Sequence, residues 1–155
     1  MSDKVREMEL IATELQVRRL DDGVPLPAYQ KEGDAGLDLC SAENVVIEPG
    51  ERRVIGTGIA VAIPSGYVGF TTPRSGLAAR QGLSMVNAPG VIDSGYRGEI
   101  KIILVNLDPR EPIDLKRGDR VAQLVVVPVA TVRIVESTEL PGSQRGEGGL
   151  GSTGV

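Results

Sequence analysis

Glycine and proline divide this chain of 155 residues into short β-forming runs, and this punctuation limits the fold more than any other feature. The chain contains 20 Gly and 10 Pro, and turn signals include PG at 49–50, PSG at 64–66 and DPREP at 108–112. Between the turns lie stretches rich in Val, Ile and Thr, which favour strands. Such spacing predicts an all-β fold, either a distorted barrel or a double-sheet jelly roll.

The predicted strands lie between these turn signals at 13–20, 36–41, 44–50, 51–66, 67–72, 83–92, 98–108, 113–118 and 119–137. Apolar and polar residues alternate at 54–63 and 99–105, as they do in half-buried strands. Only 76–81 (GLAARQ) predicts a helix, of one or two turns. Aromatic residues make up 3% of the chain, so the predicted core consists of Val, Ile, Leu and Ala. The length predicts one domain.

The last fifteen residues, PGSQRGEGGLGSTGV, contain six Gly and one large apolar residue, Leu150. A segment of this composition buries too little surface to order itself. We therefore predict a β domain over 1–140 and a mobile tail over 141–155. The tail is either plain disorder or a lid, in which Arg145, Ser152 and Thr153 bind a polyphosphate.

Charge and hydropathy exclude several classes of partner. The formal net charge is -4, from 17 basic and 21 acidic residues, whereas a duplex-binding protein is usually basic. We therefore expect no nucleic acid partner, although a local basic cluster could still bind a small phosphorylated ligand. The charged start MSDKVREME does not resemble a signal peptide, and no apolar run approaches ~20 residues. These features predict a cytoplasmic protein with no membrane partner.

The chain has no His and one Cys, Cys40, which restricts its chemistry. A His/Cys zinc site and Ser-His or Cys-His catalysis cannot be built within the chain. We interpret Cys40 as a small buried apolar residue, and its lack of a disulfide partner indicates a reducing compartment. A general base must then be a carboxylate, a Lys, a Tyr or the thiol.

Asp93 is the best placed candidate for that base. It lies in NAPGVIDSGYRGE, where Pro-Gly and Ser-Gly pairs flank Val91, Ile92 and Asp93 in a predicted tight hairpin between two strands. Glycine beside a hairpin tip lets the backbone approach a ligand closely. The alternative is that the carboxylate only stabilises its own turn.

Two further places could bind phosphate or metal. Arg74 and Ser75 lie where a predicted strand ends and the predicted helix begins, and amides, a hydroxyl and a guanidinium together form an anion site. An RSG match alone is weak. Asp38 in GDAGLDL could hold Mg²⁺ through water beside phosphates, or it could be an ordinary strand-end carboxylate.

Five segments in fixed order give a far more specific indication. They are AGLDL at 35–39, PRSGLA at 73–78, NAPGVIDSGYRGEIK at 87–101, RGDRVAQLV at 117–125 and RGEGGLGSTG at 145–154. Together they resemble the five motifs of the trimeric dUTPases, which hydrolyse dUTP to dUMP and pyrophosphate. The resemblance implies a β jelly roll, a homotrimer with sites shared between chains, and Mg²⁺ as the cofactor. This activity keeps uracil out of DNA and supplies dUMP for thymidylate synthesis.

The resemblance also implies a role for each candidate residue. Asp93 would deprotonate the water that attacks the α-phosphate. Main-chain groups around Val91 and Ile92, with the Asn87 amide, would pair with uracil. Tyr96 would pack under the deoxyribose and exclude a ribose 2′-hydroxyl.

Most of the remaining candidates would surround the phosphates, whereas Lys101 would lie near the nucleotide pocket and Leu150 would cover the base. By the same resemblance, the substrate phosphates would hold most of the Mg²⁺, and Asp38 would contact the ion through water. Leu150 departs from the family pattern, because an aromatic ring usually stacks on uracil there and leucine offers no π-face. The other expected substrate-binding residues are Arg74, Ser75, Gly76, Lys101, Gln123, Arg145, Ser152 and Thr153.

Two alternatives remain at this stage. A dCTP deaminase shares the fold, but Asp93 in GVIDSGYRG and the complete Gly-rich tail favour the diphosphatase. A non-catalytic trimeric nucleotide-binding module would be expected to have lost the base or the tail arginine. Both Asp93 and Arg145 are present in this chain.

Overall fold

The computed structural model describes residues 13–149, which form ten strands and one short helix. This arrangement confirms the all-β prediction, and the expected helix is α1 (Ser75–Gln81). No helix within the described part of the chain has the length and apolar character needed to cross a membrane. The strands are β1 (Gln16–Arg19), β2 (Leu37–Cys40), β3 (Val45–Ile47), β4 (Arg52–Ala62), β5 (Tyr67–Pro73), β6 (Leu83–Met85), β7 (Gly90–Ile92), β8 (Glu99–Asn106), β9 (Ile113–Leu115) and β10 (Arg120–Pro128).

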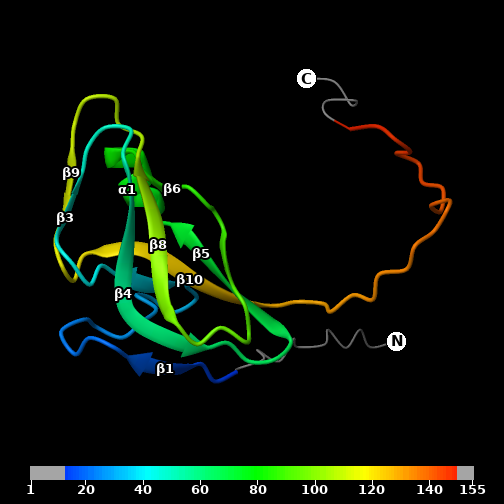
Figure 1. Cartoon of the computed structure of the whole chain (residues 1–155), viewed down its shortest axis with the longest axis horizontal. Coiled ribbons are helices and arrows are strands. Elements are labelled where there is room, and N and C mark those ends of the chain that lie inside the picture. Colours follow the sequence, from blue (N-terminus) through cyan, green and yellow to red (C-terminus); the bar gives the residue numbers. More distant parts are fainter. Residues whose placement is uncertain (1–12, 150–155) are drawn as a thin grey trace, which may run out of the picture.

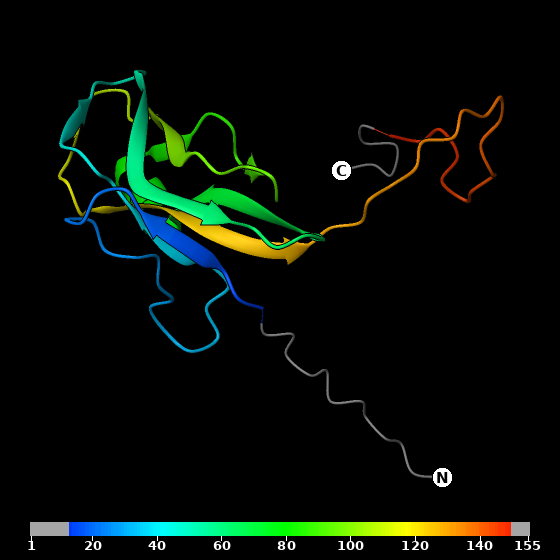
Figure 2. The ribbon, with the colours of Figure 1, turned by 60° about the horizontal axis from the view of Figure 1, so that its bottom comes forward.

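The strands form two four-stranded antiparallel sheets and a two-stranded ribbon. One sheet has the order β1-β4-β8-β6, the other has the order β2-β10-β5-β7, and β3 pairs with β9. Figure 1 shows the long bent strand β4 beside β8, and Figure 2 shows the orange strand β10 running next to β5. The sheets and the ribbon bury one common aliphatic core.

Strand β8 shows how the sequence pattern builds this core. Ile100, Ile102 and Leu104 are buried, and the residues between them are more exposed, as the predicted alternation requires. Burial of one such side chain contributes about 1.5–3 kcal/mol relative to leaving it in water. Buried partners from the other elements include Leu39, Ile47, Ile55, Leu83, Ile113 and Leu124.

The alternation predicted over 54–63 holds only in part, because β4 contains an irregularity. Its pairing with β8 shifts register between Gly56 and Ala60, and every residue from Thr57 to Val61 is buried. Extra residues in one strand bend that strand and change which face its side chains occupy. The Thr57 hydroxyl donates to the main-chain oxygen of Ile100 at 2.6 Å, which joins the irregular segment to β8.

The predicted single strand at 83–92 is wrong, and so is the predicted tight hairpin that carries Asp93. The segment divides into β6, which pairs with β8, and β7, which pairs with β5 in the other sheet. Val91 and Ile92 therefore lie within a short strand. Asp93 begins a turn, closed by the Tyr96 N–H donating to the Asp93 oxygen at 3.0 Å, that connects the two sheets.

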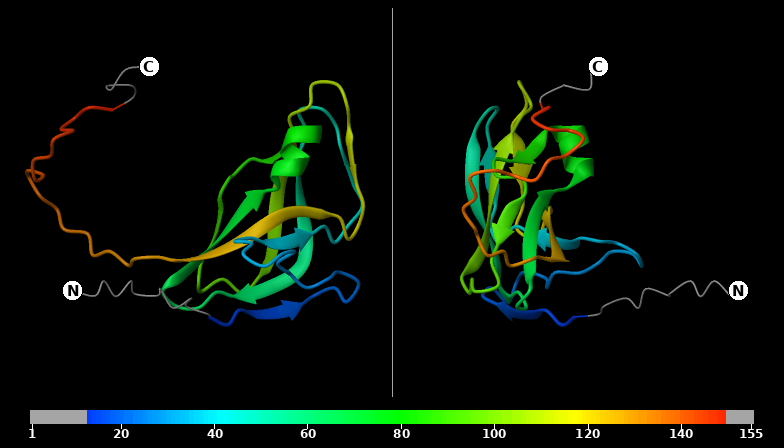
Figure 3. Two further views of the ribbon diagram at one scale, coloured as in Figure 1. Left: turned by 180° about the vertical axis from the view of Figure 1, so that it is seen from behind. Right: turned by 90° about the vertical axis from the view of Figure 1, so that its right-hand side faces the viewer.

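The predicted strand at 119–137 is too long, because β10 ends at Pro128. Pro128 pairs with Tyr67, the first residue of β5, so the neighbouring strand provides no further partner. After a bond from the Val129 N–H to the Gly66 oxygen at 2.9 Å, the described backbone up to residue 149 makes no hydrogen bond to the body. Figures 1 and 3 show this orange-to-red segment extending away from the sheets.

Candidate active site

A small polar cavity lies between β7 and the start of β8, and we call it the base pocket. Its volume is about 210 Å³, below the roughly 300–1,000 Å³ typical of sites that enclose a drug-sized ligand. The pocket can therefore enclose only part of a nucleotide. Its lining residues are Thr71, Asn87, Gly90, Val91, Ile92, Asp93, Tyr96, Glu99 and Lys101.

Side-chain hydrogen bonds fix the loop between β7 and β8. The Tyr96 hydroxyl donates to the Glu99 main-chain oxygen at 2.8 Å. The Arg97 guanidinium donates to the main-chain oxygens of Ser94 and Tyr96 at 2.6 and 2.9 Å. The Tyr96 ring is therefore held at both the main chain and the hydroxyl, beside Asp93.

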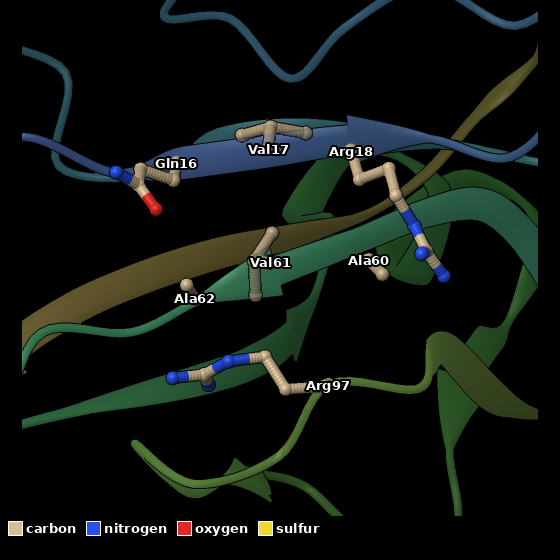
Figure 4. A pocket seen from close by; sticks show the side chains of 7 residues that line it. All are labelled: Gln16, Val17, Arg18, Ala60, Val61, Ala62 and Arg97. Carbon is tan, nitrogen blue, oxygen red and sulfur yellow. The ribbon is translucent and has the colours of Figure 1, made fainter.

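Arg97 also borders a separate surface depression of about 500 Å³. Figure 4 shows Arg97 on one side of the end of β4 and the β1 side chains Gln16, Val17 and Arg18 on the other. None of the predicted site residues lines this depression. The contribution of Arg97 to the base pocket is thus the bracing of its loop.

At Gly90 in the base pocket and at Gly98 just before β8, another side chain lies where a Cβ would stand. A Cβ on Gly90 would stand 2.3 Å from Thr71 Oγ1, and a Cβ on Gly98 would stand 2.5 Å from the Tyr96 hydroxyl oxygen. Contacts this short are not tolerated without movement of the neighbouring group. Gly90 therefore leaves space for Thr71, and Gly98 leaves space for the Tyr96 ring.

A second cavity, which we call the anion pocket, has a volume of about 570 Å³. It lies over β2 and β10, where Gln123 is directly opposite Asp38 in the strand register. This pocket shares no lining residue with the base pocket. Its lining residues are Gln30, Lys31, Asp34, Ala35, Gly36, Asp38, Arg74, Ser75, Arg120, Gln123 and Val125.

Asp38 and two arginines form the charged centre of the anion pocket. Asp38 is 7% exposed, with Arg74 Nε at 3.2 Å from Oδ1 and Arg120 Nη1 at 3.1 Å from Oδ2. Arg74 Nη1 also donates to the Arg120 main-chain oxygen at 3.2 Å. A buried carboxylate needs such partners, because desolvation of an unpaired charge is very costly.

Arg74 still has an unsatisfied donor in this arrangement. Its Nε is buried and close to Asp38, yet the direction of the N–H does not meet the geometry of a hydrogen bond. The distance between Arg74 Nε and Asp38 Oδ1 would allow a hydrogen bond, but the angle at the N–H does not. We follow the angle, because misaligned hydrogen bonds are weak. The Nε is itself buried, so an oxyanion entering the pocket would meet the exposed part of the Arg74 side chain, which is 24% exposed.

Arg74 occupies the N-cap position of α1 but makes no side-chain cap bond. Its side chain turns back to β2 and β10 instead. Gly76, in the first turn of α1, does not line either pocket, and Arg80 is the nearest neighbour of its missing side chain. The expected phosphate contact of Gly76 stays a prediction.

Cys40 is buried, with 7% exposure, as the sequence analysis expected. Burial raises the pKa of its thiol, and the nearby Asp38 carboxylate raises that pKa further. A protonated, buried thiol is a poor nucleophile. This environment agrees with the interpretation of Cys40 as a packing residue.

The predicted site residues thus separate into three groups. Asn87, Val91, Ile92, Asp93, Tyr96 and Lys101 line the base pocket, and Asp38, Arg74, Ser75 and Gln123 line the anion pocket. Arg145 lies in the segment away from the sheets, where its Nε donates to the Gly148 oxygen at 2.8 Å. Leu150, Ser152 and Thr153 lie outside the described residues.

Sequence reasoning missed Thr71, Glu99 and Arg120. Glu99 and Arg120 lie inside motifs already recognised, and Glu99 Oε1 accepts the Gly58 N–H at 3.0 Å. Nothing in the sequence indicated that Arg120 pairs with Asp38, because 82 residues separate the two. No local sequence feature marked Thr71, because its place in the pocket depends on its pairing with Gly90 of β7.

The carboxylates suit a magnesium ion held mainly by phosphates, not one held by the protein alone. Within residues 13–149 no three Cys, Asp or Glu side chains are placed together to hold a metal ion. Both oxygens of Asp38 already face arginines. Mg²⁺ commonly binds through one or two carboxylates with substrate phosphates and water as its other ligands.

The described chain thus combines an all-β fold with a small polar pocket and a separate cavity lined by arginines. The family model named dUTPase matches residues 22–154. The chain belongs to the dUTPase family.

Relatives of known sequence agree with this assignment. The deoxyuridine 5′-triphosphate nucleotidohydrolase of Streptomyces avermitilis is 60% identical over 138 residues, which are 89% of this chain and 79% of that protein. The protein of the same name from Mycobacterium avium is 58% identical, over 93% of this chain and 97% of its own length.

Solved structures agree as well. The dUTPase of Staphylococcus bacteriophage 80alpha with dUPNHPP superimposes with a TM-score of 0.85 at 36% identity, over 93% of this chain and all of that chain. A mutant dUTPase from phage phi11 of S. aureus, solved to reveal the coordination of a structural Mg(II) ion, gives 0.76 at 34% identity, over 82% and 98% of the two chains.

Proposed function

We propose that this chain hydrolyses dUTP to dUMP and pyrophosphate, with Asp93 as the general base and the two pockets binding opposite ends of the nucleotide. The observation that carries the proposal is the composition of the pockets. One contains two carboxylates, an amide, a lysine and a tyrosine in a small space. The other contains two arginines, a lysine, two aspartates, a serine and two glutamines in a larger space.

Asp93 is suited to the role of base by its surroundings. It is an exposed carboxylate at a turn, and within the described residues no salt bridge or side-chain hydrogen bond engages it. A carboxylate that accepts no hydrogen bond from a protein side chain can accept one from a water molecule and then take its proton. The reaction then needs only positioning and electrostatic stabilisation, which phosphate-binding groups supply.

The uracil end of the substrate enters the base pocket in this proposal. Main-chain groups of Val91 and Ile92, with the Asn87 amide, pair with the polar edge of the base. A site that pairs with particular polar groups leaves some of its own groups unpaired when another base enters. The pocket is also too small to accept large additions to the ring.

The phosphate chain binds at the anion pocket. Arg74, Ser75 and Gln123 supply donors, and the guanidinium of Arg74 adds a positive charge beside the cavity. Binding of phosphate would weaken the hold of Arg74 on Asp38. The freed Asp38 oxygen could then contact the water shell of Mg²⁺, and the metal would stabilise charge on the phosphates.

In this proposal the chain forms a homotrimer, and each site combines groups from different subunits. Within one chain the two pockets have no lining residue in common, which is compatible with such an arrangement. The segment after β10 also exposes apolar side chains that water does not favour, including Val132, Ile134 and Leu140 at 77%, 91% and 87%. In this proposal a neighbouring subunit covers them, and the following tail brings Arg145, Ser152 and Thr153 to the phosphates, with Leu150 over the base.

The proposal is tested by measuring pyrophosphate release from dUTP, dTTP, dCTP and UTP, with and without Mg²⁺. We expect strong selectivity for dUTP and a marked loss of rate without the metal. Conversion of dCTP to dUTP or dUMP would support the deaminase alternative instead. Binding of dUTP without pyrophosphate release would indicate a non-catalytic module.

Substitution of Tyr96 tests sugar selection. Tyr96→Ala should raise kcat/KM for UTP relative to dUTP by about 10-fold or more, because the ring would no longer fill the space beside C2′. Tyr96→Phe keeps the ring and loses only the bond to Glu99, so it should remain selective. Unchanged exclusion of UTP by Tyr96→Ala would show that another group reads the sugar.

A further inference from the structure

Thr71 on β5 is a buried residue whose side chain lines a cavity. The residue is 2% exposed, yet it borders the base pocket. Its hydroxyl makes no hydrogen bond to another group of residues 13–149. Thr57, which is also a buried residue, provides the contrast, because its hydroxyl donates to the Ile100 oxygen at 2.6 Å.

The strand pairing explains why this hydroxyl reaches the pocket. Thr71 lies directly opposite Gly90 in the pairing of β5 with β7. Because Gly90 has no side chain, Thr71 Oγ1 occupies the space 2.3 Å from where a Gly90 Cβ would stand. Asn87 Nδ2 lies 3.3 Å from the same point, so a hydroxyl and an amide share one wall of the pocket.

This pair of groups has a chemical consequence when the pocket is filled. A hydroxyl that faces an open pocket can exchange hydrogen bonds with water, but a bound ligand removes that water. The hydroxyl must then bond to the ligand, because leaving it unpaired weakens binding. A threonine hydroxyl both donates and accepts, whereas the amide nitrogen of asparagine only donates.

We propose that the Thr71 hydroxyl binds the polar edge of the nucleobase together with the Asn87 amide, and that it helps to position uracil in the pocket. This assignment rests on the proposed function. Uracil presents a carbonyl acceptor next to an N–H donor, which suits an amide donor beside a hydroxyl that can accept.

The test compares Thr71→Val, which keeps the shape and removes the hydroxyl, with Thr71→Ser, which keeps the hydroxyl. Steady-state kinetics with dUTP and dCTP, and inhibition by dUMP, are measured for each. Thr71→Val should raise KM for dUTP about 3- to 10-fold with kcat nearly unchanged. It should also weaken dUMP inhibition by a similar factor, while the preference for dUTP over dCTP changes little, because a hydroxyl can pair with either base. Thr71→Ser should stay near the parent.

Thr13→Val is the matched control, because Thr13 is exposed, lines neither pocket and receives the identical substitution. It should leave KM for dUTP unchanged. Thr71→Ala repeats the comparison if valine disturbs the strand. A parental KM in Thr71→Val or Thr71→Ala would overturn the assignment. So would a Thr71→Ser variant as impaired as Thr71→Val, which would show that the methyl group is what matters.

An error in the role of Thr71 and an error in the proposed function would give different experimental results. An active parent whose Thr71→Val variant is indistinguishable from it overturns only the role of Thr71. A parent that releases no pyrophosphate from dUTP overturns the proposed function, and the assignment of Thr71 with it.

Discussion

Asp93→Asn is expected to lower kcat for dUTP by roughly 10²–10⁴-fold while KM changes little. Asparagine keeps the shape of the side chain and can still orient a water through its oxygen, but it cannot take the proton. Because Asp93 is exposed and belongs to a turn held by main-chain bonding, the substitution should not affect folding. Pyrophosphate release at saturating dUTP measures the effect.

Two variants make this test specific. Asp22→Asn makes the same change at an exposed carboxylate that lines neither pocket, and it should retain parental turnover. Glu99→Gln alters the other carboxylate of the base pocket, whose Oε1 already accepts the Gly58 N–H. If Asp93→Asn kept its turnover and Glu99→Gln lost it, Glu99 would be the base.

Ending the chain after Leu140 is expected to reduce turnover by roughly 10²-fold or more while the melting temperature barely moves. The described part of the removed segment, 141–149, contributes no side chain to the core and bonds only within itself. Loss of a closing segment instead leaves the phosphates open to water and misplaced. Thermal unfolding and pyrophosphate release are measured on the same preparation. Full turnover in the shortened chain would reduce the tail to plain disorder.

Mixing the two inactive proteins tests whether sites are shared between chains. Asp93→Asn with an intact tail and the shortened chain with Asp93 are unfolded and refolded together. In a cyclic trimer containing both, one site of the three would combine an intact base with an intact tail. About three quarters of randomly assembled trimers are mixed, so activity should recover to roughly a quarter of the parent level. Confirmed mixed trimers without recovery would refute shared sites.

Local sequence patterns predicted much of the fold because they report local physics. The alternation at 99–105 became β8, and GLAARQ became most of α1. Cys40 is buried as expected. The family motifs also selected residues that the folded chain gathers into two cavities, although their catalytic and binding roles stay predictions until they are measured.

The errors all concern partners that lie far away in the chain. The run at 83–92 reads as one strand, but β6 and β7 pair with different sheets. The run at 119–137 has strand-forming residues throughout, yet β10 ends where β5 has no more residues to pair with. Strand propensity cannot detect either event, because a strand persists only where another strand accepts its hydrogen bonds.

The sequence by itself determined which residues favour strands, where the chain turns, and which family it resembles. Those properties depend on side-chain shape, glycine and proline geometry, and short motifs, all of which act over a few residues. Only the tertiary structure decided that Asp38 pairs with Arg120, or that Thr71 lies across from Gly90. These contacts depend on strand register, and register is set by how all the strands fill one core together.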